Sequence, residues 1–159
     1  MNVSEQFFFI FEIKSSTMKL RNILATICGV IVSLIVIIIG EGIAHAMNPL
    51  PAGVDMQNPD EFKKFISHAP ISLHLIILGN YALACFTGAL TAASIATEKK
   101  MNKAMSLGGI FMGVGMFSLV SLSHPMWVVI ASVFVFLPFA YLGGKLSVNI
   151  SDRKKGADL

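Results

Sequence analysis

Charged residues are scarce in this chain. Of its 159 residues only 13% are Asp, Glu, Lys or Arg, whereas soluble domains have about 25%. Hydrophobic residues make up 55% of the sequence. This composition excludes an ordinary soluble domain. Cysteine is also rare: Cys28 and Cys85 both lie in apolar segments, where a thiol is usually a small packing residue.

Motifs of common enzyme and nucleotide sites are also absent. The glycines form no phosphate-binding loop with a lysine, and no set of Ser, His and Asp has a hydrolase motif around it. Asp55, Asp60 and Glu61 lie where turn and cap residues are expected. The net charge of +3 reflects membrane topology and contact with anionic lipid. We therefore expect no catalytic residues, no nucleic-acid partner and a non-enzymatic protein.

Four long apolar segments are the main feature that is present. Each has about 20 residues or more without a charge, which is the length that crosses a bilayer as a helix. We predict membrane helices over residues 20–46, 71–97, 104–123 and 126–147. They leave no room for a separate soluble domain, so residues 1–159 form one transmembrane domain. The predicted fold class is an all-α polytopic membrane protein with four transmembrane helices.

The segments outside the predicted spans are short. Residues 1–19 form an N-terminal segment that either lies at the membrane interface or precedes the true start of the protein. Residues 47–70 form the loop between helices one and two. Within this loop, Asn58 and Pro59 followed by two acids are typical of a helix start. We predict a short amphipathic helix here, which lies on the membrane surface or caps the bundle.

Basic residues are distributed unevenly along the chain. Ten of the twelve precede helix one, lie between helices two and three, or follow helix four. The other two, Lys63 and Lys64, lie in the 47–70 loop. By the positive-inside rule, the ten face the cytoplasm. We predict a multi-pass protein of the inner (plasma) membrane with both termini cytoplasmic and the 47–70 loop on the outer side.

Four titratable side chains lie at the same predicted depth. Glu41 and His45 share one face of helix one, while His74 and His124 lie at the outer ends of helices two and four. At 1.5 Å per residue, all four lie about 30 to 36 Å from the inner ends of their helices. Three imidazoles beside a carboxylate suit zinc or copper. We therefore predict a metal site formed by Glu41, His45, His74 and His124.

Other interpretations of these residues stay open. Imidazole titrates near neutral pH, so the cluster could pass or sense protons. Alternatively, the histidines are interfacial residues with their polar tips in water, and Glu41 bonds to His45 or caps the nearby loop. Asn80 and Tyr81, one or two turns inward from His74, either extend a polar path or form interhelical hydrogen bonds.

Small residues recur at the spacing that favours close helix packing. Helix two carries a small residue every fourth position, and helix three has two glycines four residues apart. Such stripes let another helix approach closely. We predict helix-packing roles for Gly88, Gly109 and Gly113, either within the bundle or against a protein partner or a second copy of the chain.

A family resemblance is carried by the stretch Glu41-x3-His45-x3-Pro49-x-Pro51-x-Gly53-x-Asp55-x3-Pro59. It resembles the signature of a family of uncharacterised small bacterial four-helix membrane proteins. The likeness extends over most of residues 20–146, including His124-Pro125-Met126-Trp127 and Leu137-Pro138 with Gly143-Gly144. Asn48 and Leu50 depart from the family, in which an aromatic residue and more prolines are usual. The resemblance implies the same architecture and singles out the same polar residues, but it implies no activity.

Two functions from different classes follow from these observations. The first is a non-enzymatic structural or accessory component of a membrane complex, which associates through its glycine-rich helix faces. The second is a small metal- or proton-handling membrane protein that uses the cluster of Glu41 and the histidines. A stoichiometric protein partner would favour the first function, and a stoichiometric metal would favour the second.

Overall fold

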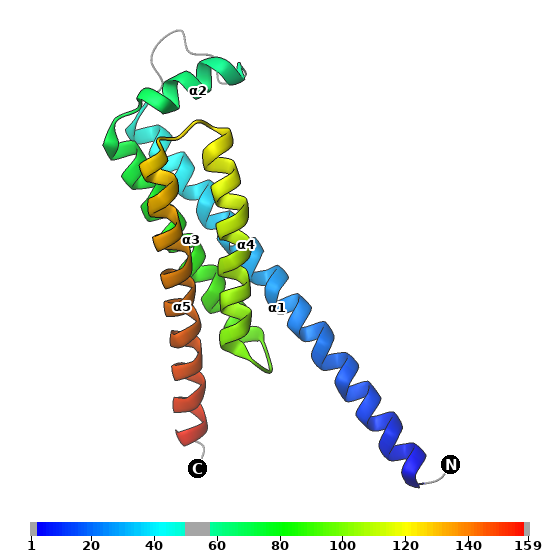
Figure 1. The fold of residues 1–159 in the computed structure, drawn as a ribbon. Coiled ribbons are helices and arrows are strands. Elements are labelled where there is room, and N and C mark those ends of the chain that lie inside the picture. The colour runs from blue at the N-terminus through cyan, green and yellow to red at the C-terminus, as the bar shows by residue number, and fades with distance from the viewer. Residues whose placement is uncertain (1–2, 50–57, 158–159) are drawn as a thin grey trace.

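The structure is a computed structural model that describes residues 3–49 and 58–157. Within these residues it is all-α, with the helices α1 (Val3–Met47), α2 (Pro59–His68), α3 (Ile71–Ile95), α4 (Lys100–Ser121) and α5 (Met126–Ala157) (Figure 1). Four of them contain segments that are long and apolar enough to cross a membrane, over Leu20–Met47, Ile71–Ile95, Lys100–Ser121 and Met126–Lys154. The prediction of four spans with a short helix between the first two is confirmed, and the chain is an integral membrane protein.

The helix ends differ from the predicted ones at the two termini. Helix α1 begins at Val3, so most of the predicted N-terminal segment continues the first span as one helix. Helix α5 runs on to Ala157, ten residues beyond its predicted end at residue 147. The apolar pattern that marks a span stops where the lipid does, but a helix needs no apolar face to continue into water. The proline-rich part of the 47–70 loop falls mostly in residues 50–57, outside the described residues.

Helix α2 forms where its capping residues predicted it. The side chain of Asn58 accepts a hydrogen bond from the Asp60 amide at 3.2 Å, and Pro59 occupies the first helical position. One face of α2 is apolar. This face packs against Ala44 of α1 and Leu73 of α3 through Phe62, Phe65 and Ile66. Helix α2 therefore caps one end of the bundle, here called the α2 end.

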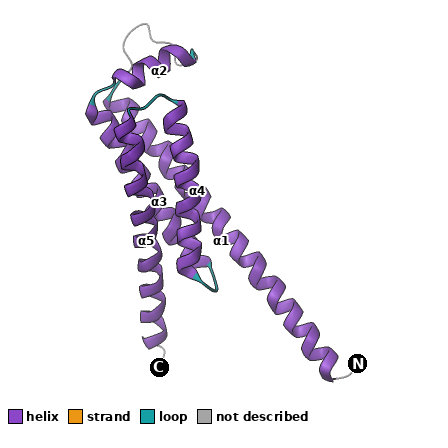
Figure 2. Ribbon diagram, in the orientation of Figure 1, coloured by secondary structure: helices purple, strands orange, loops and turns teal. Residues whose placement is uncertain are grey.

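Helix α3 is the centre of the bundle. It packs along much of its length against α1 and against α5, while α4 packs mainly on α5 (Figure 1). Helix α1 runs obliquely across the bundle and meets α4 only briefly, so its N-terminal half leaves the other helices. The turns from α2 to α3, from α3 to α4 and from α4 to α5 are short, and the first residues of α1 and the last residues of α5 lie at the end opposite α2 (Figure 2).

Backbone contact between α1 and α3 is close. A Cβ atom placed on Gly88 would lie 2.7 Å from the Gly29 carbonyl oxygen and would collide with the Ser33 hydroxyl. The Ser33 hydroxyl donates a hydrogen bond of 2.8 Å to the Ala84 carbonyl. Further along, the Asn80 amide donates one of 3.1 Å to the Ile37 carbonyl. Two polar side chains thus bond across the helix pair where no water competes.

The glycines of α4 have a different environment. A Cβ atom on Gly109 or Gly113 would meet no atom of the described residues within 4 Å. Their neighbours on the helix, Val114 and Phe117, are 64% and 76% exposed. On the opposite face of α4, Gly108 lies directly against Ala140 of α5. The bundle therefore uses Gly88 and Gly108 for close helix contacts, and it leaves the face with Gly109 and Gly113 open.

The α1–α3 contact predicts a large difference between two glycine substitutions. Gly88→Ala should lower the melting temperature, because the new methyl group forces apart backbones that cannot shift independently, at a cost of about 1–3 kcal/mol. Gly113→Ala is the matched control. It should leave the melting temperature unchanged or raise it slightly, since alanine favours a helix over glycine by about 1 kcal/mol. Equal changes in thermal unfolding of the two purified variants would contradict the observed packing.

Candidate functional site

Three segments bring the predicted polar residues to the α2 end of the bundle. Glu41 and His45 lie on the last turns of α1, His74 lies on the first turn of α3, and His124 lies in the turn between α4 and α5. The two histidines of α3 and the α4–α5 turn come together. Their ring centres are 5.5 Å apart and their planes are nearly perpendicular, at 87°. The ring of Trp127 lies 5.8 Å from that of His74.

The turn after α4 determines the position of His124. Ser123 adopts a left-handed conformation with φ of 58°. The amide of Ser123 donates to the Val120 carbonyl, and the amide of His124 donates to the Leu119 carbonyl, both at 3.0 Å. This pair of bonds is the Schellman motif that ends many helices. It turns the chain so that the His124 ring returns over the end of α4, where only 8% of the residue is exposed.

Backbone carbonyls define the protonation of both rings. The Nδ1 atom of His74 lies 3.2 Å from the Pro70 carbonyl oxygen, and that of His124 lies 3.3 Å from the Leu119 carbonyl oxygen. A carbonyl oxygen only accepts hydrogen bonds, so in the neutral rings Nδ1 carries the proton and Nε2 carries a lone pair. Both Nε2 atoms are buried, and neither has a hydrogen-bond partner among the described residues.

The surroundings of His124 favour its neutral form. Burial lowers the pKa of this imidazole, and the neighbouring His74 lowers it further, while the bond to Leu119 partly offsets both effects. His124 lies between the spans, in the turn that joins α4 to α5. His74 is still more deeply buried, with 1% of the residue exposed. The two rings thus place two buried Nε2 atoms close together in an environment with little water.

A small cavity lies beside the histidine pair. It has a volume of about 70 Å³, and Glu41, His45, Tyr81 and His124 are among its lining residues, although the lining surface itself is almost entirely apolar. The remaining lining is apolar and comes mainly from α2 and α3, including Phe62, Phe65, Ile66, Leu73 and Ile77. Glu41 and His45 are exposed on α1, whereas His124 is buried. We call this cavity the α2 pocket. An exposed residue, Glu41, and a buried one, His124, both line it.

The structure places the four predicted ligands in two subsets. His74 pairs with His124, while Glu41, His45 and His124 line the α2 pocket. Over residues 3–49 and 58–157, no three side chains of His, Cys, Asp or Glu lie close enough together to hold one metal ion. Side chains at the same depth along their helices therefore need not meet at one point, because the direction of each side chain also depends on how its helix is rotated about its axis.

One feature of the site follows a residue singled out in the sequence and another does not. Tyr81, one or two turns inward from His74, lines the α2 pocket together with Glu41. The Leu119 carbonyl orients His124 from within an apolar helix, and a helix-end motif without glycine gives no strong signal in a sequence. Asn80, by contrast, forms the interhelical bond that was one of its two predicted roles.

Comparisons with known proteins identify no family. The chain matches no protein-family model, no curated protein and no solved structure.

Proposed function

We propose that this integral membrane protein is a non-enzymatic metal-handling protein that binds copper between His74 and His124. The observation that supports the proposal is the pair of buried Nε2 atoms, neither of which has a hydrogen-bond partner in the described part of the chain. A buried polar atom normally finds a hydrogen-bond partner, and leaving it without one costs about 1–3 kcal/mol. Two such atoms on neighbouring rings are accounted for if they share a ligand that accepts lone pairs, as a metal ion does.

The geometry of the pair suits one ion between two rings. An imidazole bound through nitrogen at about 2 Å has its ring centre about 3 Å from the ion, so two rings that share an ion have centres up to about 6 Å apart. The observed separation of 5.5 Å lies within that limit. The backbone carbonyls of Pro70 and Leu119 hold the outer nitrogens, as second-shell acceptors do in many metal sites.

Copper fits two neutral nitrogens better than zinc does. Zinc sites almost always have three or four protein ligands, and the described residues provide no third His, Cys, Asp or Glu at this pair. Monovalent copper accepts low coordination numbers, and imidazole is a suitable ligand for it. In this proposal, Glu41 and His45 attract the cation to the α2 pocket, from which His124 takes it. They do not bind the ion at the same time as the pair.

A second candidate function is that of a structural or accessory component of a membrane complex. The open face of α4 favours it, because Gly109 and Gly113 face no other helix and Phe117 beside them is exposed. Small residues on a lipid-facing helix allow another transmembrane helix to approach closely. The occupant would be a second copy of the chain or a different membrane protein.

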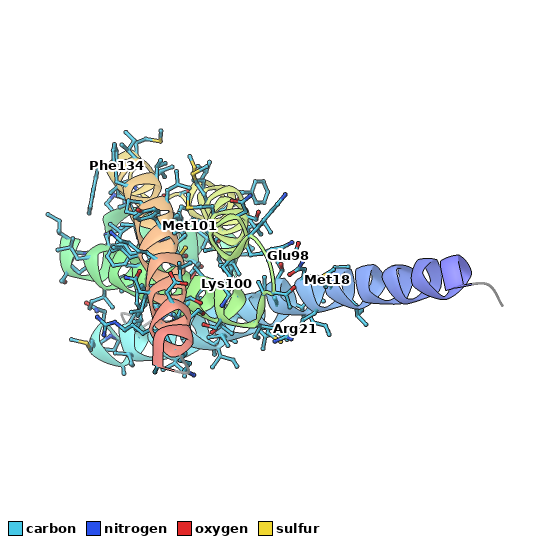
Figure 3. The ribbon with its side chains drawn as sticks, turned by 90° about the horizontal axis from the view of Figure 1, so that it is seen from below. Met18, Arg21, Glu98, Lys100, Met101 and Phe134 are labelled. Atoms are coloured by element: carbon cyan, nitrogen blue, oxygen red, sulfur yellow. The ribbon has the colours of Figure 1, made fainter. Side chains whose placement is uncertain are left out.

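We also propose an inner-membrane location with both termini in the cytoplasm. Ten of the twelve basic residues precede the first apolar run, lie between the second and third, or follow the fourth. Arg21 and Lys100, two of the ten, lie at the end of the bundle opposite α2 (Figure 3). There Arg21 donates a hydrogen bond of 3.1 Å from Nε to the Ile95 carbonyl, and Lys100 donates to the Ser151 hydroxyl. These cations suit the cytoplasmic side of a membrane. Membership of the bacterial four-helix family described above would agree with this location.

Copper retention tests the histidine pair. The purified protein should retain about one copper ion per chain after incubation with excess monovalent copper and removal of the unbound metal. His74→Asn and His124→Asn should each lose that ion. His68→Asn is the matched control, because His68 is exposed on α2 and bonds to the Lys64 carbonyl. Saturating copper, at 100 times its Kd, should stabilise the wild type by about 2.7 kcal/mol in thermal unfolding. Equal retention by all four proteins would refute the site.

Assembly size tests the α4 face. Gly113→Leu should shift the protein in mild detergent to a smaller assembly, as measured by light scattering, because the larger side chain blocks close helix contact. Gly79→Leu on α3 is the control, since a Cβ atom there also meets no described atom within 4 Å. If wild type and both variants have the same assembled mass, α4 faces lipid only.

Cysteine labelling in intact cells tests the orientation. A membrane-impermeant maleimide should label Ser67→Cys, on the exposed surface of α2, without permeabilisation. It should label Asn102→Cys, in the first turn of α4, only after permeabilisation. The unsubstituted chain measures the background from the two native thiols. The reverse pattern would place both termini outside.

A further inference from the structure

A second cavity lies between α1 and α4, where the oblique course of α1 separates the two helices. Its volume is about 130 Å³, and all four spans contribute to its walls. We call it the α1–α4 cleft. Its lining is almost entirely apolar, with Tyr81 and Ser118 as the polar exceptions, and includes Leu34, Ile37, Phe111, Val114 and Phe136. Such a wall suits a hydrocarbon chain.

Tyr81 joins this cleft to the α2 pocket. The residue lines both cavities, so the two adjoin at its side chain. Along α1, Glu41 of the pocket lies seven residues from Leu34 of the cleft, or about 10 Å. Both cavities have almost entirely apolar linings, with Tyr81 between them, and Glu41 supplies a charged residue at the α2 end. This is the pattern of a site for an amphiphilic molecule.

The charge beside the α2 pocket selects the kind of head group. Among the described residues, Glu41 is the only Asp, Glu, Lys or Arg that lines this pocket. A carboxylate near hydrocarbon is costly unless a partner compensates it. An ammonium group is such a partner, since it has three donors and a positive charge. A head group that carries a phosphate or carboxylate would instead be repelled.

We infer that the α2 pocket and the α1–α4 cleft together bind a single-chain amphiphile with an ammonium head, whose head group pairs with Glu41 while its chain passes Tyr81 into the cleft. The cavity volumes of about 70 and 130 Å³ compare with the roughly 150 Å³ of a core cavity that holds benzene, so together they hold a segment of one hydrocarbon chain. The inference goes beyond copper binding, because it depends on Glu41 and the cleft and not on the Nε2 atoms of the histidines.

Photocrosslinking with three matched probes tests this inference. Each probe has the same twelve-carbon chain with a diazirine at its end, and the heads are an amine, an alcohol and a carboxylate. The amine should label the cleft residues Leu34, Val114 or Ser118, as mapped by mass spectrometry on the intact protein in detergent. Labelling should saturate, and unlabelled dodecylamine should compete with it. The alcohol and carboxylate should label these residues at least tenfold less.

Three variants separate the parts of the site. Val114→Trp fills the cleft and should abolish the competed labelling, whereas Val120→Trp, on the exposed surface of α4, should not change it. Glu41→Gln should remove the preference for the amine. His74→Asn should lose copper but keep the amine, so failure of one proposal is distinguishable from failure of the other. Equal labelling by all three heads, unsaturable labelling over the whole lipid-facing surface, or full labelling of Val114→Trp would each overturn the inference.

Discussion

The close contact of α1 with α3 determines the course of α1 and, through it, the geometry of the α2 end and of the α1–α4 cleft. Gly29 and Gly88 bring the two backbones together, and the Ser33 and Asn80 side chains bond across the contact to carbonyls of the opposite helix. Helix α1 is held by this contact alone over much of its length, because it meets α4 only briefly and does not pack on α5. This contact therefore sets the oblique course of α1. The oblique course in turn opens the cleft between α1 and α4 and places Glu41 beside α2.

The sequence predicted the elements well because each has a local cause. Uncharged runs marked the four spans, and the Asn58 cap with Pro59 marked α2, whose apolar face lies on the bundle end as one of the two predictions stated. The helix termini were less predictable. Polar residues after the span carry no signal for where a helix ends, so the sequence did not predict that α5 continues to Ala157.

The candidate site was predictable in its residues and depth but not in its grouping. Counting residues along a helix gives the depth of a side chain along the bundle, and the four side chains do lie at one end of the bundle. Which of them meet depends on the rotation of each helix and on the turn before α5. Ser123 in its left-handed conformation brings His124 to His74, and the carbonyl of Leu119 then orients the ring. The glycines show the same limit: equal spacing on α3 and α4 does not reveal that Gly88 faces a helix and Gly113 does not.

His124 belongs to both candidate sites, and this has an electrostatic consequence. Its ring stacks edge-on with His74 and also lines the pocket that contains Glu41. A cation at the histidine pair and an ammonium group at Glu41 would therefore lie in neighbouring volumes where little water screens them. One carboxylate can offset one positive charge, and in a medium of low dielectric constant a second cation would be strongly repelled. If both sites are as proposed, Glu41 would thus offset the charge at only one of them at a time.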